Sequence, residues 1–169
     1  MKRILRLGLV VVILVAWVGC DQIVKQFVRV SLFKSPPISL LYDSIHLAYT
    51  ENPGAFLGLG ANLPGTARNA SAIAFASLVL IVTLGAALNT RSPSTVQLAG
   101  LALVAAGGLG NLIDRLTNNG SVIDFLRLGI GPLHTGVFNV ADIAIVAGLV
   151  LFLVFSPRGG EEAAADQRA

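Results

Sequence analysis

Four long apolar runs constrain this chain more than any other feature. They cover about residues 4–20, 70–88, 95–113 and 137–155, and they contain almost no charged side chains. A helix needs roughly 20 apolar residues to cross the hydrocarbon core of a bilayer, and a helix satisfies its own backbone polar groups there. We therefore predict a mainly α membrane protein with four transmembrane helices.

The composition supports this prediction and excludes other classes. Charged residues make up 12% of the 169 residues, against roughly 25% in soluble domains, so a soluble globule of this size could not cover its surface. The basic residues are scattered and form no stripe, so we expect no nucleic-acid partner. Cys20 is the single cysteine, which excludes an internal disulfide framework.

Six basic residues fall on the opposite side of the predicted membrane, but the first helix usually sets the orientation, and five basic residues flank the apolar runs on the side where this helix begins. They are Lys2, Arg3, Arg6, Arg91 and Arg158. The positive-inside rule places both termini in the cytoplasm, including a polar tail over 158–169 that we expect to be disordered. The longer connections, about 32–67 and 114–136, then lie on the outer face.

Polar residues converge on that outer face although they are far apart in sequence. They are Asp21, Lys25, Asn111, Asp114, Arg115, Asp124, Asn139 and Asp142. Ionisable residues at membrane depth are costly and indicate a functional site. In the connection 38–60, alternating apolar residues at 45, 47 and 49 and the turn Asn52-Pro53-Gly54 predict a small cap that contains strands.

Asp124 and Asp142 are the pair that could perform acid/base chemistry. Two carboxylates held close together cannot both ionise easily, so one keeps a proton while the other acts as a base. Asn139 lies three residues before Asp142, so both should face the same side of the fourth helix. The alternative is that Asp142 only caps this helix and that Asp124 is a solvated loop acid.

Other polar residues have structural explanations. Asp21 and Lys25 are four residues apart, which favours an ion pair on one helix. Small residues such as Gly107 and Gly108 permit close helix packing. Packing does not explain Asn111 and Arg115, which could bind the backbone of a substrate.

Several familiar patterns carry little weight. Ser31 and Lys34 match a short nucleophile pattern that occurs often by chance. His46 and His134 lack the spacing of metal ligands, so we expect no metal and no cofactor. The segment from Met1 to Cys20 is similar to a lipoprotein signal, but bulky Trp17 and three further apolar runs weigh against it. Two alternatives to an enzyme therefore stay open: a non-catalytic multi-span protein and a lipidated membrane protein.

Five short motifs together resemble a known family. In order, they are Asp21-Gln22-Ile23-Val24-Lys25, Asn52-Pro53-Gly54-Ala55-Phe56, Gly110-Asn111-Leu112-Ile113-Asp114-Arg115, Val122-Ile123-Asp124-Phe125 and Phe138-Asn139-Val140-Ala141-Asp142. This chain resembles lipoprotein signal peptidase, also called signal peptidase II, over about residues 4–157. The resemblance implies one membrane-embedded peptidase domain, residues 1–157, with a small periplasmic β-cradle.

The resemblance also implies an activity and a set of site residues. Such enzymes are intramembrane aspartic endopeptidases of the bacterial inner membrane, which cut diacylglyceryl-modified prolipoproteins just before the lipidated cysteine. The catalytic residues would be Asp124 and Asp142, near the periplasmic face. Asn52, Asn111, Arg115 and Asn139 would bind substrate, whereas four residues would support the structure: Asp21, Lys25, Gly54 and Asp114.

Further expectations follow from the same resemblance. The partners would be prolipoprotein substrates, membrane lipid and globomycin-type inhibitors, and the protein would be a monomer. One motif departs from the family pattern. Many members have Asn-x-Gly-Ala-Ala-Phe-Ser, whereas this chain has Asn52-Pro53-Gly54-Ala55-Phe56-Leu57-Gly58, which changes the expected shape of the cradle loop.

Overall fold

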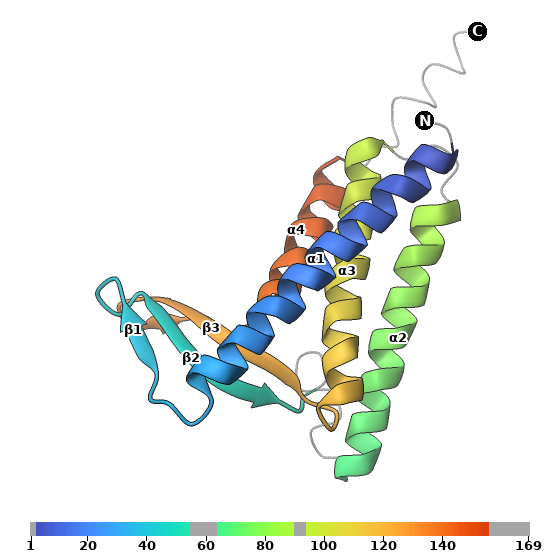
Figure 1. Ribbon diagram of the computed structural model, residues 1–169. Coiled ribbons are helices and arrows are strands. Elements are labelled where there is room, and N and C mark those ends of the chain that lie inside the picture. The colour runs from blue at the N-terminus through green and yellow to red at the C-terminus, as the bar shows by residue number, and fades with distance from the viewer. Residues whose placement is uncertain (1–2, 55–63, 90–93, 156–169) are drawn as a thin grey trace, which may run out of the picture.

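The described part of the chain forms four helices and a small antiparallel sheet (Figure 1). The computed structural model describes residues 3–54, 64–89 and 94–155. The helices are α1 (Arg3–Leu32), α2 (Gly65–Asn89), α3 (Thr95–Thr117) and α4 (Val140–Val154). The strands are β1 (Ile38–Leu40), β2 (Ile45–Asn52), β3 (Val122–Ile130) and β4 (Leu133–His134). The predicted class, a mainly α membrane protein with a small sheet, is confirmed.

Within the described residues, three helices are long and apolar enough to cross a membrane: α1, α2 and α3. Helix α4 is also apolar but has only 15 residues. We expected this helix to begin near Val137, and that boundary is wrong. Phe138 is still held in a β-bridge with Leu126, and Asn139 caps the helix, so the first helical residue is Val140.

Helix α3 is the centre of the bundle. It packs against α1, α2 and α4, and most of its residues are buried, whereas α1 and α2 turn many large apolar side chains outward. Glycines let α4 approach α3 closely. A Cβ atom added at Gly107 would overlap the carbonyl oxygen of Ala141, and one added at Gly100 would lie 2.7 Å from the carbonyl oxygen of Gly148.

The two ends of the bundle have different chemistry. The beginnings of α1 and α3 and the ends of α2 and α4 lie together at one end (Figure 1). That end holds an apolar cluster that includes Val10, Ala87 and Leu98. The sheet lies at the opposite end, where the end of α1 contacts β2 and the end of α3 contacts β3.

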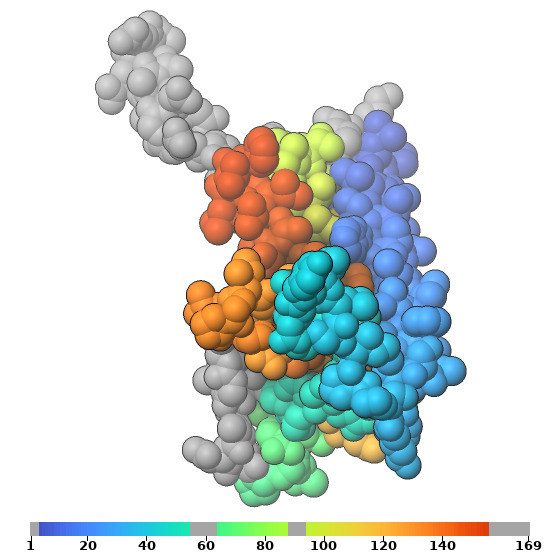
Figure 2. All heavy atoms as spheres, turned by 90° about the vertical axis from the view of Figure 1, so that its left-hand side faces the viewer, coloured from blue at the N-terminus to red at the C-terminus, as the bar shows by residue number. Residues whose placement is uncertain are grey.

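The sheet consists of two adjoining hairpins in the order β1-β2-β3-β4, and all neighbouring strands are antiparallel. Figure 2 shows the two hairpins side by side, with the β1–β2 segment in cyan and the β3–β4 segment in orange. The register between β2 and β3 shifts between Leu47 and Thr50, next to the pair formed by Thr50 and Asp124. Such a bulge re-aims nearby side chains, and it occurs here beside one of the predicted site residues.

Some predicted features lie outside the described residues. They are Lys2 near the start of the chain, Ala55, Phe56, Leu57 and Gly58 of the departing motif, Arg91 in the short link, Arg158 and the 158–169 tail. The strand expected around residues 45–49 is present as the first part of β2, and a short partner strand, β1, precedes it.

Gly107 and Gly108 provide a matched test of close packing between α3 and α4. Gly107→Ala should destabilise the protein by about 1–3 kcal/mol, because the new methyl group meets backbone that cannot move aside. Gly108→Ala should be neutral or stabilising by up to about 1 kcal/mol, because a Cβ atom there meets no atom within 4 Å and alanine favours a helix. Thermal unfolding of both variants in detergent measures the difference. Equal unfolding temperatures would contradict the close approach.

Candidate active site

The ammonium group of Lys25 lies at the centre of the polar end of the bundle. Its side chain is 2% exposed and comes from α1. Nζ lies 2.8 Å from Asp21 Oδ2 and 3.0 Å from Asp114 Oδ2, and it donates a hydrogen bond of 3.1 Å to Asn111 Oδ1. The predicted pair of Asp21 and Lys25 is therefore present and is extended by α3. Removing one partner from such a buried cluster typically costs about 3–5 kcal/mol.

Asp21 connects this cluster to the beginning of α4. Its Oδ1 atom accepts a hydrogen bond of 2.9 Å from the backbone N–H of Ala141. The first N–H groups of a helix lack partners within the helix and carry partial positive charge, so a buried carboxylate is well placed there. Asp21 thus fixes α4 relative to α1.

Asp114 connects the cluster to the sheet. Its Oδ2 atom accepts a hydrogen bond of 3.0 Å from the backbone N–H of Ile123, one residue before Asp124. Gln22 reinforces the joint, because its side-chain amide donates to Asp114 Oδ1 at 3.0 Å and to the carbonyl oxygen of Gly110 at 3.2 Å. Sequence spacing alone indicates no role for Gln22, which stands three positions before Lys25 on the side of α1 that faces α3.

Asn111 connects Lys25 to Asp142 through the two ends of its side-chain amide. Because the amide oxygen of Asn111 accepts from Lys25, its amide nitrogen must point the other way. That nitrogen, Nδ2, donates to Asp142 Oδ1 at 2.9 Å. The buried ion cluster therefore selects which end of the Asn111 amide faces the carboxylate.

Asn139 and Asp142 form a reciprocal cap at the beginning of α4. Asn139 Oδ1 accepts from the N–H of Asp142 at 3.0 Å, and Asp142 Oδ2 accepts from the N–H of Asn139 at 3.1 Å. The interpretation of Asp142 as a helix cap is thus correct, but incomplete. Its other carboxylate oxygen accepts from Asn111 on a different helix, and the side chain is only partly buried.

Asp124 is not the solvated loop acid of the alternative interpretation. It lies in β3 and is 3% exposed. Oδ1 accepts a hydrogen bond of 2.7 Å from the side-chain amide of Asn139, and Oδ2 accepts one of 2.9 Å from Asn52. Asn139 therefore holds both acids, Asp124 through its side-chain amide and Asp142 through the cap.

This environment changes the acidity of Asp124. Burial raises the pKa of Asp124 to about 6, and the nearby charge of Asp142 acts in the same direction. Hydrogen bonds from Asn52 and Asn139 favour the ionised form and limit the rise. An acid with a raised pKa that shares an asparagine with a second acid is suited to acid/base chemistry.

Gly54 and Arg115 border this pair on the β2 side. The N–H of Gly54 donates to Asn52 Oδ1 at 2.9 Å, which turns the amide nitrogen of Asn52 toward Asp124. Arg115 donates to the carbonyl oxygens of Gly54 and Asn111, both at 3.2 Å. Its Nε atom is buried and makes no protein hydrogen bond. One N–H of Arg115 is thus free to bind a further group.

The residues of the weaker sequence patterns lie away from this site. Ser31 and Lys34 lie exposed at the end of α1. Cys20 is exposed in the middle of α1, which continues without a break to Leu32. His46 and His134 come from the outer part of the sheet.

Comparisons with known proteins identify the family. A sequence profile described as signal peptidase (SPase) II matches residues 13–157. The lipoprotein signal peptidase of Desulforapulum autotrophicum is 36% identical over 152 residues, covering 90% of this chain and 91% of that protein. That of Syntrophomonas wolfei is 40% identical, covering 79% and 83% of the two chains. This chain belongs to the lipoprotein signal peptidase family.

Solved structures agree with this assignment at the level of the fold. A bacterial membrane enzyme determined in meso at 1.9 Å resolution superposes with a TM-score of 0.77 at 21% identity, covering 89% of this chain and 94% of that one. A second, at 2.3 Å resolution, gives a TM-score of 0.75 at 24% identity and covers 87% and 86%. The family cleaves signal peptides from prolipoproteins, so the alternatives without proteolytic activity are not favoured.

The raised pKa of Asp124 predicts a pH-dependent contribution to stability. Between about pH 4 and pH 6 the folded protein keeps a proton that the unfolded chain releases. The free energy of unfolding therefore falls as pH rises through this window, by about 3 kcal/mol at most. Asp124→Asn has no such group, so its unfolding temperature relative to the unsubstituted protein should rise between pH 4 and pH 7.

Thermal unfolding in detergent at several pH values checks this expectation. Gly108→Ala, which changes no ionisable group, should show a pH-independent difference and serves as the control. A constant difference for Asp124→Asn as well would contradict the assigned burial of the carboxylate.

Proposed function

We propose that this chain is an intramembrane aspartic endopeptidase in which Asp124 and Asp142 form the catalytic pair. One observation carries the proposal: a strand and a helix deliver two carboxylates to the same asparagine, Asn139, and the pKa of one of them is raised to about 6. Membership of a peptidase family supports it. An amide bond is the substrate for which such a pair is suited.

In this mechanism Asp124 carries the shared proton and Asp142 is the base. Asp142 removes a proton from a water molecule, whose oxygen attacks the carbonyl carbon of the scissile amide. Asp124 donates its proton to the carbonyl oxygen, giving a neutral tetrahedral species. Collapse of this species breaks the C–N bond: the proton held by Asp142 passes to the leaving nitrogen, and one hydroxyl proton of the species returns to Asp124, which gives the carboxylic acid and restores the shared proton. Asn52, Asn111 and Asn139 keep the two carboxylates in position throughout.

Arg115 is the residue that we propose to contact the substrate backbone most directly. Its unpartnered Nε lies beside the carboxylate pair, and a peptide carbonyl oxygen would accept from it. Asn52, Asn111 and Asn139 would contribute further contacts where their amides border the peptide, and Gly54 would hold Asn52 in place. Asp21, Lys25 and Asp114 would act through structure alone.

We propose prolipoproteins that carry diacylglyceryl on cysteine as the substrates, cut just before that cysteine. The large apolar side chains exposed on α1 and α2 would face lipid, so a lipid-anchored substrate can approach within the membrane plane. A cyclic peptide of the globomycin type would compete for the same site. We infer a monomer, because all of the proposed catalytic residues come from one chain.

We further propose a bacterial inner-membrane location with both termini in the cytoplasm. Arg3 and Arg6 lie at the beginning of α1, and the end of α4 is at the same end of the bundle (Figure 1). The sheet and the carboxylate pair lie at the opposite end, which would be periplasmic.

The catalytic pair is tested with asparagine substitutions. Asp124→Asn and Asp142→Asn should each lower prolipoprotein cleavage by about a hundredfold or more, because asparagine cannot exchange a proton. The double variant should be hardly worse than either single variant, since the two residues act as one unit. Turnover is measured with purified protein in detergent and normalised to folded protein.

Asp21→Asn and Asp114→Asn are the matched controls among the buried acids. Both should lower the unfolding temperature through Lys25 and leave measurable turnover. Substantial cleavage by Asp124→Asn or Asp142→Asn would refute the catalytic pair. Complete loss of cleavage in folded Asp114→Asn would show that Asp114 belongs to the catalytic pair.

The orientation is tested with compartment-sensitive reporters. A fusion after Ala169 should report the cytoplasm, and one inserted at Pro64, between the sheet and α2, should report the periplasm. Reports from the same side would refute the proposed topology.

A further inference from the structure

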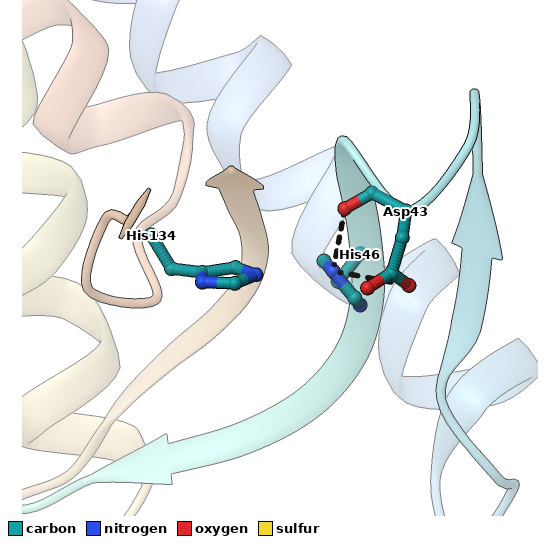
Figure 3. A group of neighbouring side chains, drawn as sticks. All are labelled: Asp43, His46 and His134. Atoms are coloured by element: carbon teal, nitrogen blue, oxygen red, sulfur yellow. Dashed lines mark hydrogen bonds and ion pairs between the residues drawn. The ribbon is translucent and has the colours of Figure 1, made fainter. Parts of the chain in front are cut away.

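Three side chains of metal-binding type meet at the outer part of the sheet: Asp43, His46 and His134 (Figure 3). Each offers one ligand atom, and these atoms all lie within 4.8 Å of one another. His46 Nε2 is 3.5 Å from Asp43 Oδ1, and the centroids of the two imidazole rings are 5.7 Å apart. Across the described ranges, no other group of three such residues comes together.

The register of the sheet brings the histidines together although 87 residues separate them. His46 in β2 pairs with Arg127 in β3, and His134 in β4 pairs with Gly129 in β3. Paired residues and residues two apart share a face of a sheet, so both imidazoles are on the same face. Gly129, which stands between them, has no side chain. A Cβ atom there would overlap Cδ2 of His134, so glycine at this position lets the ring lie across β3 toward His46.

The turn between β1 and β2 brings Asp43 to the same place. Leu41, Tyr42 and Asp43 all have positive φ values, which fold this turn back over β2. The hydroxyl of Ser39 donates a hydrogen bond of 2.6 Å to Asp43 Oδ1 and so fixes the carboxylate beside His46. The other carboxylate oxygen, Oδ2, is not used in this contact.

We propose that Asp43, His46 and His134 bind a divalent transition-metal ion, with Zn²⁺ as the best fit. Two imidazoles and one carboxylate form a donor set that suits Zn²⁺ and leaves a fourth position for water, whereas Mg²⁺ and Ca²⁺ prefer oxygen ligands. Ligand atoms on tetrahedral Zn²⁺ are about 3.4 Å apart for bonds of about 2.1 Å. The His46–Asp43 pair already has this separation, and the remaining pairs need to close by about 1.4 Å at most.

Binding requires modest rearrangement of these side chains. His46 Nε2 lies 3.0 Å from the backbone carbonyl oxygen of Asp43, which accepts a hydrogen bond from it. Coordination through Nε2 places the ring proton on Nδ1 instead and replaces this contact by the metal bond. His134 is exposed on a short hairpin, so its ring can turn without disturbing a packed core.

One neighbouring charge opposes the ion and gives the proposal an independent test. Arg127 stands opposite His46 on the same face and is exposed. Its positive charge repels a cation, so Arg127→Gln should tighten binding. An adventitious ion held elsewhere on the protein would not respond to this change.

The bound ion would tie the β1–β2 turn to the β3–β4 hairpin. Asp124 is on the opposite face of β3 from Arg127 and Gly129, because it precedes them by three and five positions, which are odd numbers. The site is therefore distinct from the carboxylate pair, and it does not depend on the proposed peptidase mechanism. Its direct effect would be to join the two hairpins at the end of the sheet away from the catalytic residues.

Zinc binding is measured on the full chain, without an affinity tag, by isothermal titration calorimetry in detergent after treatment with a chelator. The unsubstituted protein should bind one Zn²⁺. His46→Gln, His134→Gln and Asp43→Asn should each weaken binding at least about tenfold, because loss of a residue that only orients a ligand already costs about 10–100-fold in affinity. Glu51→Gln, which alters an exposed acid of the same strand β2, should bind as the unsubstituted protein does.

Further measurements test whether a substitution affects metal binding without affecting folding or cleavage, and whether the proposed ligands hold the ion. Unfolding temperature and prolipoprotein cleavage in the presence of chelator should be unchanged in His134→Gln, because neither depends on the ion. Co²⁺ in place of Zn²⁺ should give the visible absorption of a four-coordinate nitrogen and oxygen site. Absence of saturable binding, or equal affinity in folded His134→Gln, would overturn the proposal.

Discussion

The Lys25 ammonium group contacts three side chains, each of which leads to a different part of the fold. Asp21 leads to the first turn of α4, Asp114 leads to the backbone of β3, and Asn111 leads to Asp142. A lysine buried to this degree is stable only when its charge and all of its donors are satisfied. The relative positions of α1, α3, α4 and the sheet therefore depend on one cation, and so does the arrangement around both carboxylates.

The helices make apolar contacts at one end of the bundle and polar contacts at the other. At one end of the bundle the helices meet through apolar side chains and through glycines that allow backbones to touch. At the other end they meet through charges and amides. Asp21 and Asp114 both lie against Lys25, whereas Asp124 accepts hydrogen bonds from two amides and has a pKa that burial raises to about 6. The same end of the protein thus contains two acids paired with a lysine and a buried acid that is held by amide groups.

Sequence reasoning predicted those features that depend on local spacing or on bulk hydropathy. The apolar runs gave the helices, and the spacing of Asp21 and Lys25 gave their ion pair. The predicted beginning of α4 was too early. Hydropathy alone cannot show that Phe138 is still bridged to the sheet or that Asn139 caps the helix. The sequence did not predict that His46 and His134 lie close together, because their contact depends on the register of the strands and on the absence of a side chain at Gly129.

The spacing of Asp21 and Lys25 on one helix has a consequence for biosynthesis. Asp114 and Asn111 follow Lys25 by 89 and 86 residues, which at 5–20 residues per second corresponds to roughly 4–18 s of translation. During this interval α1 must reside in the membrane without the partners that later surround its charges. Because the carboxylate and the ammonium are one helical turn apart, they neutralise each other from the start. The nascent helix thus carries its own counter-ion until α3 emerges from the ribosome.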